Sequence, residues 1–196
     1  DGGEGGGGGA GSNCGFGIFP LSELGATETI TIGRGGQGTS TDQNAADGTN
    51  STFGSHVTSY GGKGGDDDDG QFAQGSTPFG RGNRNNADPA TFANHRDNFA
   101  FSIFSGGYGA RQSGSAGVTS VGGNAIFGGA GGGSSDYQND QGGAGGTSLI
   151  GGNGGAGKGG GSTPGVDGSI PGGGGGAAEE PAGGSGGDGE CWVLIF

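Results

Sequence analysis

The sequence predicts a mainly β or irregular fold with essentially no α-helix, in which packed polyglycine-II helices combine with short β-strands. Glycine makes up 61 of the 196 residues, and much of it recurs in GGx triplets such as 151–156 and 183–188. Short segments with alternating apolar residues interrupt the glycine blocks, which is the pattern of strands. No stretch has the heptads of a coiled coil or the length of a membrane span.

Glycine at this density leaves a choice between disorder and an unusual kind of order. Only 27% of the residues are hydrophobic, a composition typical of disordered chains, and disorder of the second half is the alternative that composition alone supports. Extended helices with three residues per turn make no internal hydrogen bonds, so several of them can pack and bond to one another. Glycine blocks bracketed by apolar strands favour this ordered solution. The triplets drift too much for collagen, which needs glycine at strictly every third residue.

The first half, 1–104, is predicted to contain most of the strands and a polar loop at 66–98. The predicted strands are 14–19, 26–32, 52–60 and 98–104, of which 52–60 is either one strand or a hairpin pair. The polar loop combines aromatic side chains with asparagines, arginines and prolines, which is typical of exposed loops.

The second half, 105–196, is predicted to be rich in polyglycine-II helices and to close on a C-terminal strand, 190–196. That strand holds the most apolar run of the chain. Because exposed apolar strands aggregate, we expect it to be buried or paired. The two halves are expected to form one compact unit, with a thin core that contains Ile30, Phe53 and Trp192.

The charge excludes one class of partner. The net charge is −12 with seven basic against nineteen acidic residues, so the arginine-glycine phrases at 33–36 and 109–111 do not predict nucleic-acid binding. Membrane insertion is not expected either. The chain begins at Asp1 and contains no methionine, so we expect a processed product or part of a longer polypeptide, with no signal peptide visible.

No enzyme activity, cofactor or metal is expected. The many Gly-x-Gly-x-x-Gly matches lack the following helix that a dinucleotide fingerprint needs. His56 has no second ligand at a suitable spacing and is expected on the surface. Oxygen ligands for a hard cation such as calcium occur in one acidic run, Asp66, Asp67, Asp68 and Asp69. Four adjacent carboxylates cannot all point at one ion, so a solvated acidic loop is favoured.

The two cysteines, Cys14 and Cys191, lie near opposite ends of the chain. A disulfide between them would staple the termini, and two buried free thiols are the alternative. Nothing else in the sequence has the pattern of a disulfide scaffold, which favours free thiols.

Several phrases, taken in order, resemble the glycine-rich domain of tailed-bacteriophage tail proteins. They are a strand that ends in Ile-Gly-Arg-Gly-Gly at 32–36, a Ser-Thr-Phe-Gly strand at 51–54, the GGx tracts and the closing apolar strand at 189–196. The resemblance implies a tail-fibre or adhesin component of a virion, extracellular when functional, whose glycine helices present loops to a receptor on the host-cell surface. The receptor would be a glycan or an outer-membrane protein. Further implied partners are other tail proteins and, for a fibre body, a homotrimer, and the resemblance leaves open whether the chain is a tip adhesin or fibre body.

Receptor contact is expected from aromatic side chains in polar loops, because they stack on sugars and cover flat protein patches. The expected receptor-binding residues are Phe79, Arg81, Tyr108 and Tyr137. Two other functions stay open. One is a purely structural fibre or virion component without receptor contact. The other is a glycine-rich ice-binding (antifreeze) protein, suggested by the threonine row Thr27, Thr29 and Thr31.

Overall fold

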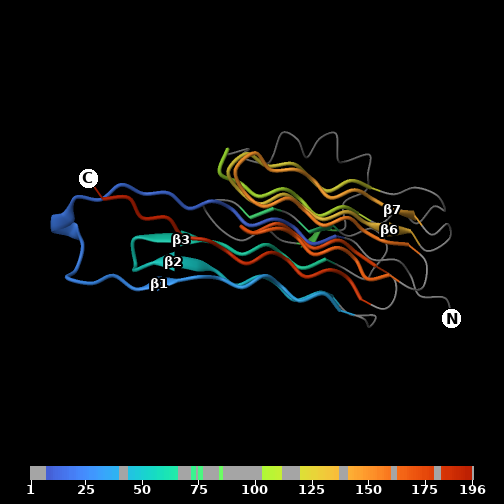
Figure 1. Ribbon diagram of the computed structural model, residues 1–196, viewed down its shortest axis with the longest axis horizontal. Coiled ribbons are helices and arrows are strands. Elements are labelled where there is room, and N and C mark those ends of the chain that lie inside the picture. Colours follow the sequence, from blue (N-terminus) through green and yellow to red (C-terminus); the bar gives the residue numbers. More distant parts are fainter. Residues whose placement is uncertain are drawn as a thin grey trace.

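Extended segments run side by side along the long axis of the molecule, and a narrow arm projects from one end (Figure 1). The computed structural model describes residues 8–39, 44–65, 72–73, 75–76, 84–85, 103–111, 120–136, 141–159, 163–178 and 182–195. Within these ranges the helical content is a single turn of 3-10 helix, η1, Leu21–Glu23, at the tip of the arm. The prediction of a mainly β or irregular fold with essentially no α-helix is therefore confirmed.

The strands of the described residues form short antiparallel ladders. The arm holds β1 (Ile30–Thr31), β2 (Ser51–Phe53) and β3 (Val57–Ser59) in one sheet with the order β1-β2-β3. Gly54 has a φ of 50° in the turn between β2 and β3, a conformation that glycine adopts without steric cost. The hairpin alternative for 52–60 is thus confirmed. Two further ladders pair β4 (Phe72–Ala73) with β5 (Arg84–Asn85), and β6 (Ser135–Asp136) with β7 (Gln141–Gly142).

The other strand predictions are wrong in extent or in kind. Residues 14–19 and 190–195 form no strand, and the strand predicted over 26–32 is reduced to β1. Of the strand predicted over 98–104, only 103–104 lie among the described residues, and they form a turn. Alternating apolar residues predict a strand only where a partner edge exists, and these segments have none that pairs with them as a ladder.

In the bundle, each extended segment bonds to a different neighbour at successive residues and returns to the same neighbour after three. The amides of Gly8, Gly11 and Cys14 donate to carbonyls of segment 103–111 at N···O distances of 2.8–2.9 Å. The residues between them donate to two further segments, 59–65 and 171–178. This three-residue period is that of a polyproline-II helix. The hydrogen bonds run between neighbouring segments of the chain because such a helix makes none internally.

Segment 128–134 is the centre of a ring of hydrogen-bonded neighbours, which we call the filled ring. From Gly129 to Ser134, every amide donates to and every carbonyl accepts from a neighbouring segment, with N···O distances of 2.8–3.2 Å. The six neighbours are 8–14, 103–111, 120–126, 141–148, 150–158 and 171–178. Adjacent members of the ring are also bonded to one another. The backbone of residues 129–134 is therefore fully satisfied without a β-sheet.

Glycine permits the close approach between neighbouring segments of the bundle. A Cβ added at Gly131 would overlap the carbonyl oxygen of Tyr108, and one at Gly11 would overlap that of Gly129. Among the described residues, the buried hydrophobic ones are all small: Ala10, Ala73, Ala110, Ala130 and Ala177. The interior is thus made of backbone. The predicted thin core is wrong, because Trp192 is 85% and Ile30 46% exposed.

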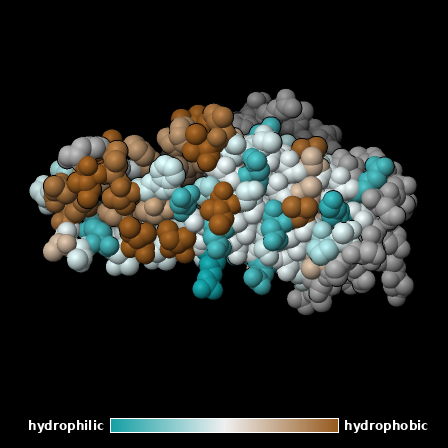
Figure 2. Space-filling view, viewed as in Figure 1, coloured by the Kyte–Doolittle hydropathy of each residue, from teal (hydrophilic) through white to brown (hydrophobic). Residues whose placement is uncertain are grey.

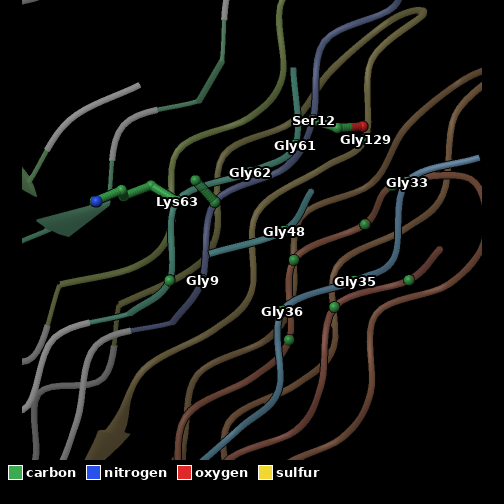
Figure 3. Close-up of a pocket in the computed structure, with 18 of the residues that line it drawn as sticks. Gly9, Ser12, Gly33, Gly35, Gly36, Gly48, Gly61, Gly62, Lys63 and Gly129 are labelled. Carbon is green, nitrogen blue, oxygen red and sulfur yellow. The ribbon is translucent and has the colours of Figure 1, made fainter. Parts of the chain in front are cut away.

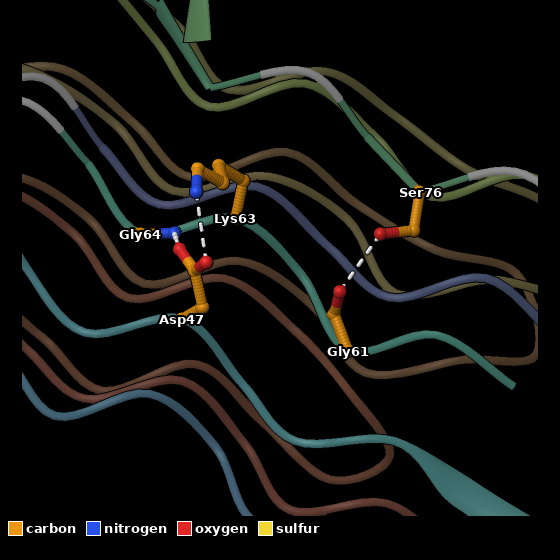
Figure 4. A network of polar contacts seen from close by, with 5 residues as sticks. All are labelled: Asp47, Gly61, Lys63, Gly64 and Ser76. Carbon is orange, nitrogen blue, oxygen red and sulfur yellow. Dashed lines mark hydrogen bonds and ion pairs between the residues drawn. The ribbon is translucent and has the colours of Figure 1, made fainter. Parts of the chain in front are cut away.

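Side chains brace the bundle where neighbouring segments meet near its surface (Figure 4). The Asp47 carboxylate accepts from the Lys63 ammonium at 2.8 Å and from the Gly64 amide at 2.9 Å. The Ser76 hydroxyl, which is fully buried, donates to the Gly61 carbonyl at 2.8 Å. These contacts connect segments 44–50 and 59–65 and residue Ser76, all of which belong to the first half of the chain.

Candidate functional site

Large apolar side chains lie exposed at one end of the molecule. They belong to the arm, to the turns at the adjoining end of the bundle and to the C-terminal segment, and we call them the apolar end. Its members are Phe16, Ile18, Ile103, Ile126, Phe127, Leu149, Ile150, Ile170, Trp192, Val193, Leu194 and Ile195. Figure 2 shows hydrophobic surface gathered on the arm and at the adjoining part of the bundle, whose flank is mostly neutral. Exposed apolar patches of this kind mark sites of interaction.

The turns of the bundle hold part of this surface in place. The amide of Ile150 donates to the carbonyl of Ile126 at 2.8 Å, and that of Phe127 donates to Ile103 at 3.1 Å. The turns are therefore bonded to one another as the segments are. Because the bundle backbone fixes each turn, its apolar side chains are presented on a rigid base.

Aromatic contacts connect the arm to the end of the bundle. The ring of Phe16 is stacked on that of Phe104, with centroids 6.3 Å apart and an interplanar angle of 2°. Phe104 in turn contacts Phe127 at 5.2 Å. Phe16 still has 70% of its surface exposed, so this contact leaves most of the ring accessible.

The C-terminal segment contributes the most exposed side chains of the apolar end. The amide of Gly189 donates to the Gly33 carbonyl at 2.8 Å, and beyond it Trp192 and Leu194 are 85% and 83% exposed. The expectation that this segment is a buried or paired strand is wrong. Its residues continue past the neighbour that bonds Gly189, so no described segment covers them.

A polar contact stabilises the hairpin of the arm. His56 Nε2 lies 3.3 Å from Glu28 Oε1, and the His56 ring lies 5.1 Å from that of Phe19. A hydrogen bond from the Gly25 amide lowers the pKa of the Glu28 carboxyl, and the contact with His56 lowers it further. His56 lies partly exposed at the surface, with 21% of its side chain accessible.

Of the four expected receptor-binding residues, Tyr108 is the one that lies in the described part of the chain. Tyr108 is 39% exposed and lies within extended segment 103–111, where its carbonyl accepts from the Gly123 amide at 2.7 Å. It therefore projects from the flank of the bundle instead of a loop. Phe79, Arg81 and Tyr137 lie outside the described residues, as does the acidic run Asp66, Asp67, Asp68 and Asp69.

The turns that form the apolar end were visible in the sequence only as interruptions of the glycine tracts. The sequence predicts that Ile126–Phe127 and Leu149–Ile150 each anchor a turn between neighbouring polyglycine helices, and the chain does bend at both pairs. Only the hydrogen-bond pattern shows that the interior has no room for them. A signal was present, because the segments on both sides contain almost nothing but small residues.

The remaining candidate chemistry is sparse. Both cysteines are free thiols, and burial raises the pKa of Cys14. In the described ranges, no three histidine, cysteine or acidic side chains come together as a metal site. The same ranges contain no helix of the length and apolarity that crossing a bilayer requires.

Two comparisons with known proteins bear on this chain. A search of curated proteins gave no match. A family model described as a glycine-rich domain matches residues 1–195. The match includes every segment of the bundle and nearly all of the apolar end. The chain therefore belongs to the glycine-rich domain family.

Proposed function

We propose that this domain is a tail-fibre or adhesin component of a bacteriophage virion, in which a rigid glycine bundle holds an apolar end against a receptor on the host-cell surface. The observation that carries the proposal is the separation of the two roles in space. The interior of the bundle is built from backbone and small side chains, while most of the exposed large apolar side chains lie on the turns, the arm and the C-terminal segment, with Tyr108, Val121 and Val166 on the flank of the bundle. The resemblance of the sequence phrases to tail proteins supplies the class of virion component.

The chemistry of the apolar end favours a flat or grooved receptor surface. Trp192, Phe16 and Phe127 offer aromatic faces, which stack on sugar rings and dominate the energetics of protein interfaces. Exposed isoleucine and leucine side chains make up most of the rest of the apolar end. A glycan with exposed apolar faces or an outer-membrane protein would be bound by the same set of contacts.

A cell-binding assay tests this proposal. The fluorescently labelled domain is incubated with a panel of bacterial strains, and bound protein is measured by flow cytometry. Replacing Trp192 and Leu194 together by serine should reduce binding to any responsive strain at least about tenfold, since buried aromatic anchors carry most of the binding energy at interfaces. Val166→Ser is the matched control, because Val166 is 44% exposed but lies in extended segment 163–170 of the bundle. Equal loss in the control would contradict a role for the apolar end.

A purely structural role is the second candidate, and the apolar end also favours it, because such a surface can be covered by another virion protein. Immunogold labelling of intact particles in electron micrographs separates the candidates from each other. Label at a fibre tip agrees with receptor contact, and label along the shaft agrees with the structural role. Absence of label from any virion, with good labelling of the purified domain, would contradict both.

A further inference from the structure

A second ring of extended segments encloses a cavity instead of a central strand. The members are 8–14, 33–39, 44–50, 59–65, 171–178 and 182–189. Each is bonded to the next at N···O distances of 2.8–3.3 Å. The ring is closed at segment 8–14, where the Gly9 amide donates to Gly175 and the Ala10 amide donates to Lys63. We call it the open ring. It has the same number of members as the filled ring and shares 8–14 and 171–178 with it.

The cavity inside the open ring has a volume of about 200 Å³ and is lined by all six segments (Figure 3). With a spacing of about 4.8 Å between chains and a rise of about 3.1 Å per residue, an extended glycine strand needs about 60 Å³ per residue. The cavity therefore has room for about one full turn. The segments that line it are seven residues or so in length, which corresponds to about 20 Å of wall.

Backbone groups on three of the walls are free to donate. The amides of Gly36, Gly62 and Gly175 line the cavity and have no hydrogen-bond partner within the described residues. In segment 171–178 the direction of the Gly175 amide follows from the three-residue period of the helix. The amides before and after it donate to segments 128–134 and 163–170. The third direction is the cavity.

The other three walls include groups that can accept. Ala10, Ala46 and Gly184 line the cavity, one from each of these walls, and their carbonyls accept no hydrogen bond from any described residue. Asn13, which is 3% exposed, also lines the cavity, and its Nδ2 has no partner in the same part of the chain. The filled ring likewise presents donors from three neighbours and acceptors from three to its central strand.

Four glycines on these walls lack the steric reason that applies to their neighbours. A Cβ added at Gly9 or Gly183 would have its nearest neighbour at 3.5 Å, and one at Gly48 or Gly186 at 3.4 Å. All four residues line the cavity. At Gly8 and Gly11, by contrast, an added Cβ would overlap the backbone of the central strand of the filled ring. The four glycines thus keep open the space that a central strand would need.

We propose that the open ring is a binding site for one extended glycine-rich strand of a partner polypeptide, which enters as the central strand and completes a second filled ring. The three free amides bind carbonyls of the strand, and the three free carbonyls accept from its amides. The walls select glycine, because a side chain on the strand has no space between six neighbouring backbones.

A separate polypeptide is the source that the hydrogen bonds favour. Every extended glycine segment among the described residues is already bonded to neighbours in its own bundle. A second copy would have to release such a segment to supply the strand. A partner with a free glycine tract pays no such cost. The site is distinct from the apolar end, so its test and the test of receptor binding can fail independently.

The test uses the whole chain and a synthetic peptide of six glycines followed by two lysines, measured by isothermal titration calorimetry. The control peptide replaces the glycines by sarcosine. It has the same charge as the glycine peptide, and its sarcosine residues also have no Cβ, but they lack the backbone N–H. We expect the glycine peptide to bind at least tenfold more tightly than the sarcosine peptide. In NMR spectra, the amide signals of Gly36, Gly62 and Gly175 should shift on binding and become protected from hydrogen exchange.

Matched variants locate the site. Gly48→Ala combined with Gly186→Ala places two Cβ atoms in the cavity and should weaken binding of the glycine peptide at least tenfold. Gly25→Ala makes the same change in the arm, outside the cavity, and should leave binding unchanged. If the double variant fails to fold, the two peptides and the three amide signals still decide the question in the unmodified chain.

Four results would overturn the proposal, and the first three come from the peptide experiments. They are absence of binding by the glycine peptide, equal binding of the two peptides, and shifts confined to amides outside the cavity. A fourth is self-association of the chain without peptide that Gly48→Ala and Gly186→Ala abolish, since it would reassign the site to a second copy.

Discussion

The filled ring and the open ring are built from the same kind of segment, and they differ in what glycine does. Around segment 128–134, an added Cβ would overlap backbone, so glycine is needed for the bundle to close. Around the cavity, Gly48 and Gly186 have 3.4 Å to the nearest atom, and glycine is not needed for the chain's own packing. The comparison shows that glycine content alone does not reveal which glycines hold the fold together and which keep a space accessible.

The hydrogen bonds differ in the same way. All amides and carbonyls of residues 129–134 are paired across the filled ring. In the open ring, side chains take over part of the pairing, as when the amides of Gly33 and Gly35 donate to Ser51 and Asp188. The filled ring is therefore closed by backbone partners alone, whereas the open ring also depends on side-chain acceptors.

The largest effect is expected at the centre of the filled ring. Gly131→Ala should destabilise the domain by more than about 3 kcal/mol, because the new Cβ meets the Tyr108 carbonyl and neither backbone can move without breaking bonds to other segments. Thermal unfolding followed by calorimetry measures the change. An unfolding temperature within a degree or two of the unmodified protein would show that the filled ring is not the stabilising unit.

An intermediate effect is expected where side chains close the open ring. Asp47→Ala removes the contacts with the Lys63 ammonium and the Gly64 amide, both of which hold segment 44–50 to segment 59–65. We expect a loss of about 1–2 kcal/mol, since the two groups left behind are only partly buried. Urea unfolding gives the value. Lys63→Met keeps the carboxylate and its bond to Gly64, so it should cost less than Asp47→Ala.

A smaller effect of opposite sign is expected for a glycine of the open ring. Gly186→Ala should leave stability unchanged or raise it by up to about 1 kcal/mol, because alanine restricts the unfolded chain and meets no overlap in the folded one. The same calorimetric experiment measures it alongside Gly131→Ala. A loss as large as that of Gly131→Ala would remove the distinction between the two rings.

The smallest effect is expected in the arm, which belongs to neither ring, and it depends on pH. The pKa of Glu28 is lowered from an ordinary value of about 4.5 by the Gly25 amide and by His56. Its carboxylate therefore contributes stability that is fully present above pH 4.5 and is lost as the pH falls through the lowered pKa. Unfolding midpoints measured between pH 6 and about pH 2 should show a weaker acid dependence for Glu28→Gln. Superimposable pH profiles of the two proteins would contradict the contact.

The fold class and the hairpin could be predicted from the sequence, because both depend on local patterns. Thr52-Phe53-Gly54 followed by Val57-Thr58 has strand residues around a glycine that can take a positive φ. GGx triplets likewise predict extended helices with three residues per turn. The extended segments before position 105, such as 8–14 and 59–65, belong to the same bundle, although the sequence predicts these helices mainly for the second half.

The apolar end and the open ring could not be predicted, because both depend on which segments become neighbours. Apolar residues such as Trp192 and Leu149 are read as core by default, since most proteins bury them. Here the interior has backbone spacing and no volume for a large side chain, so these residues are forced outward. The cavity arises from the closure of six segments from both ends of the chain, and no local pattern encodes that closure.

The three-residue period also determines which insertions and deletions the domain can accept. Removing one residue from an extended segment would turn every following amide by about a third of a rotation and aim it at a different neighbour. Length changes inside a segment are therefore compatible with the bundle only in steps of three, much as a reading frame tolerates codons but not single bases. The turns, such as Leu149–Ile150, are free of this restriction. Relatives of this domain should vary in the length of their turns while their segments keep a common frame.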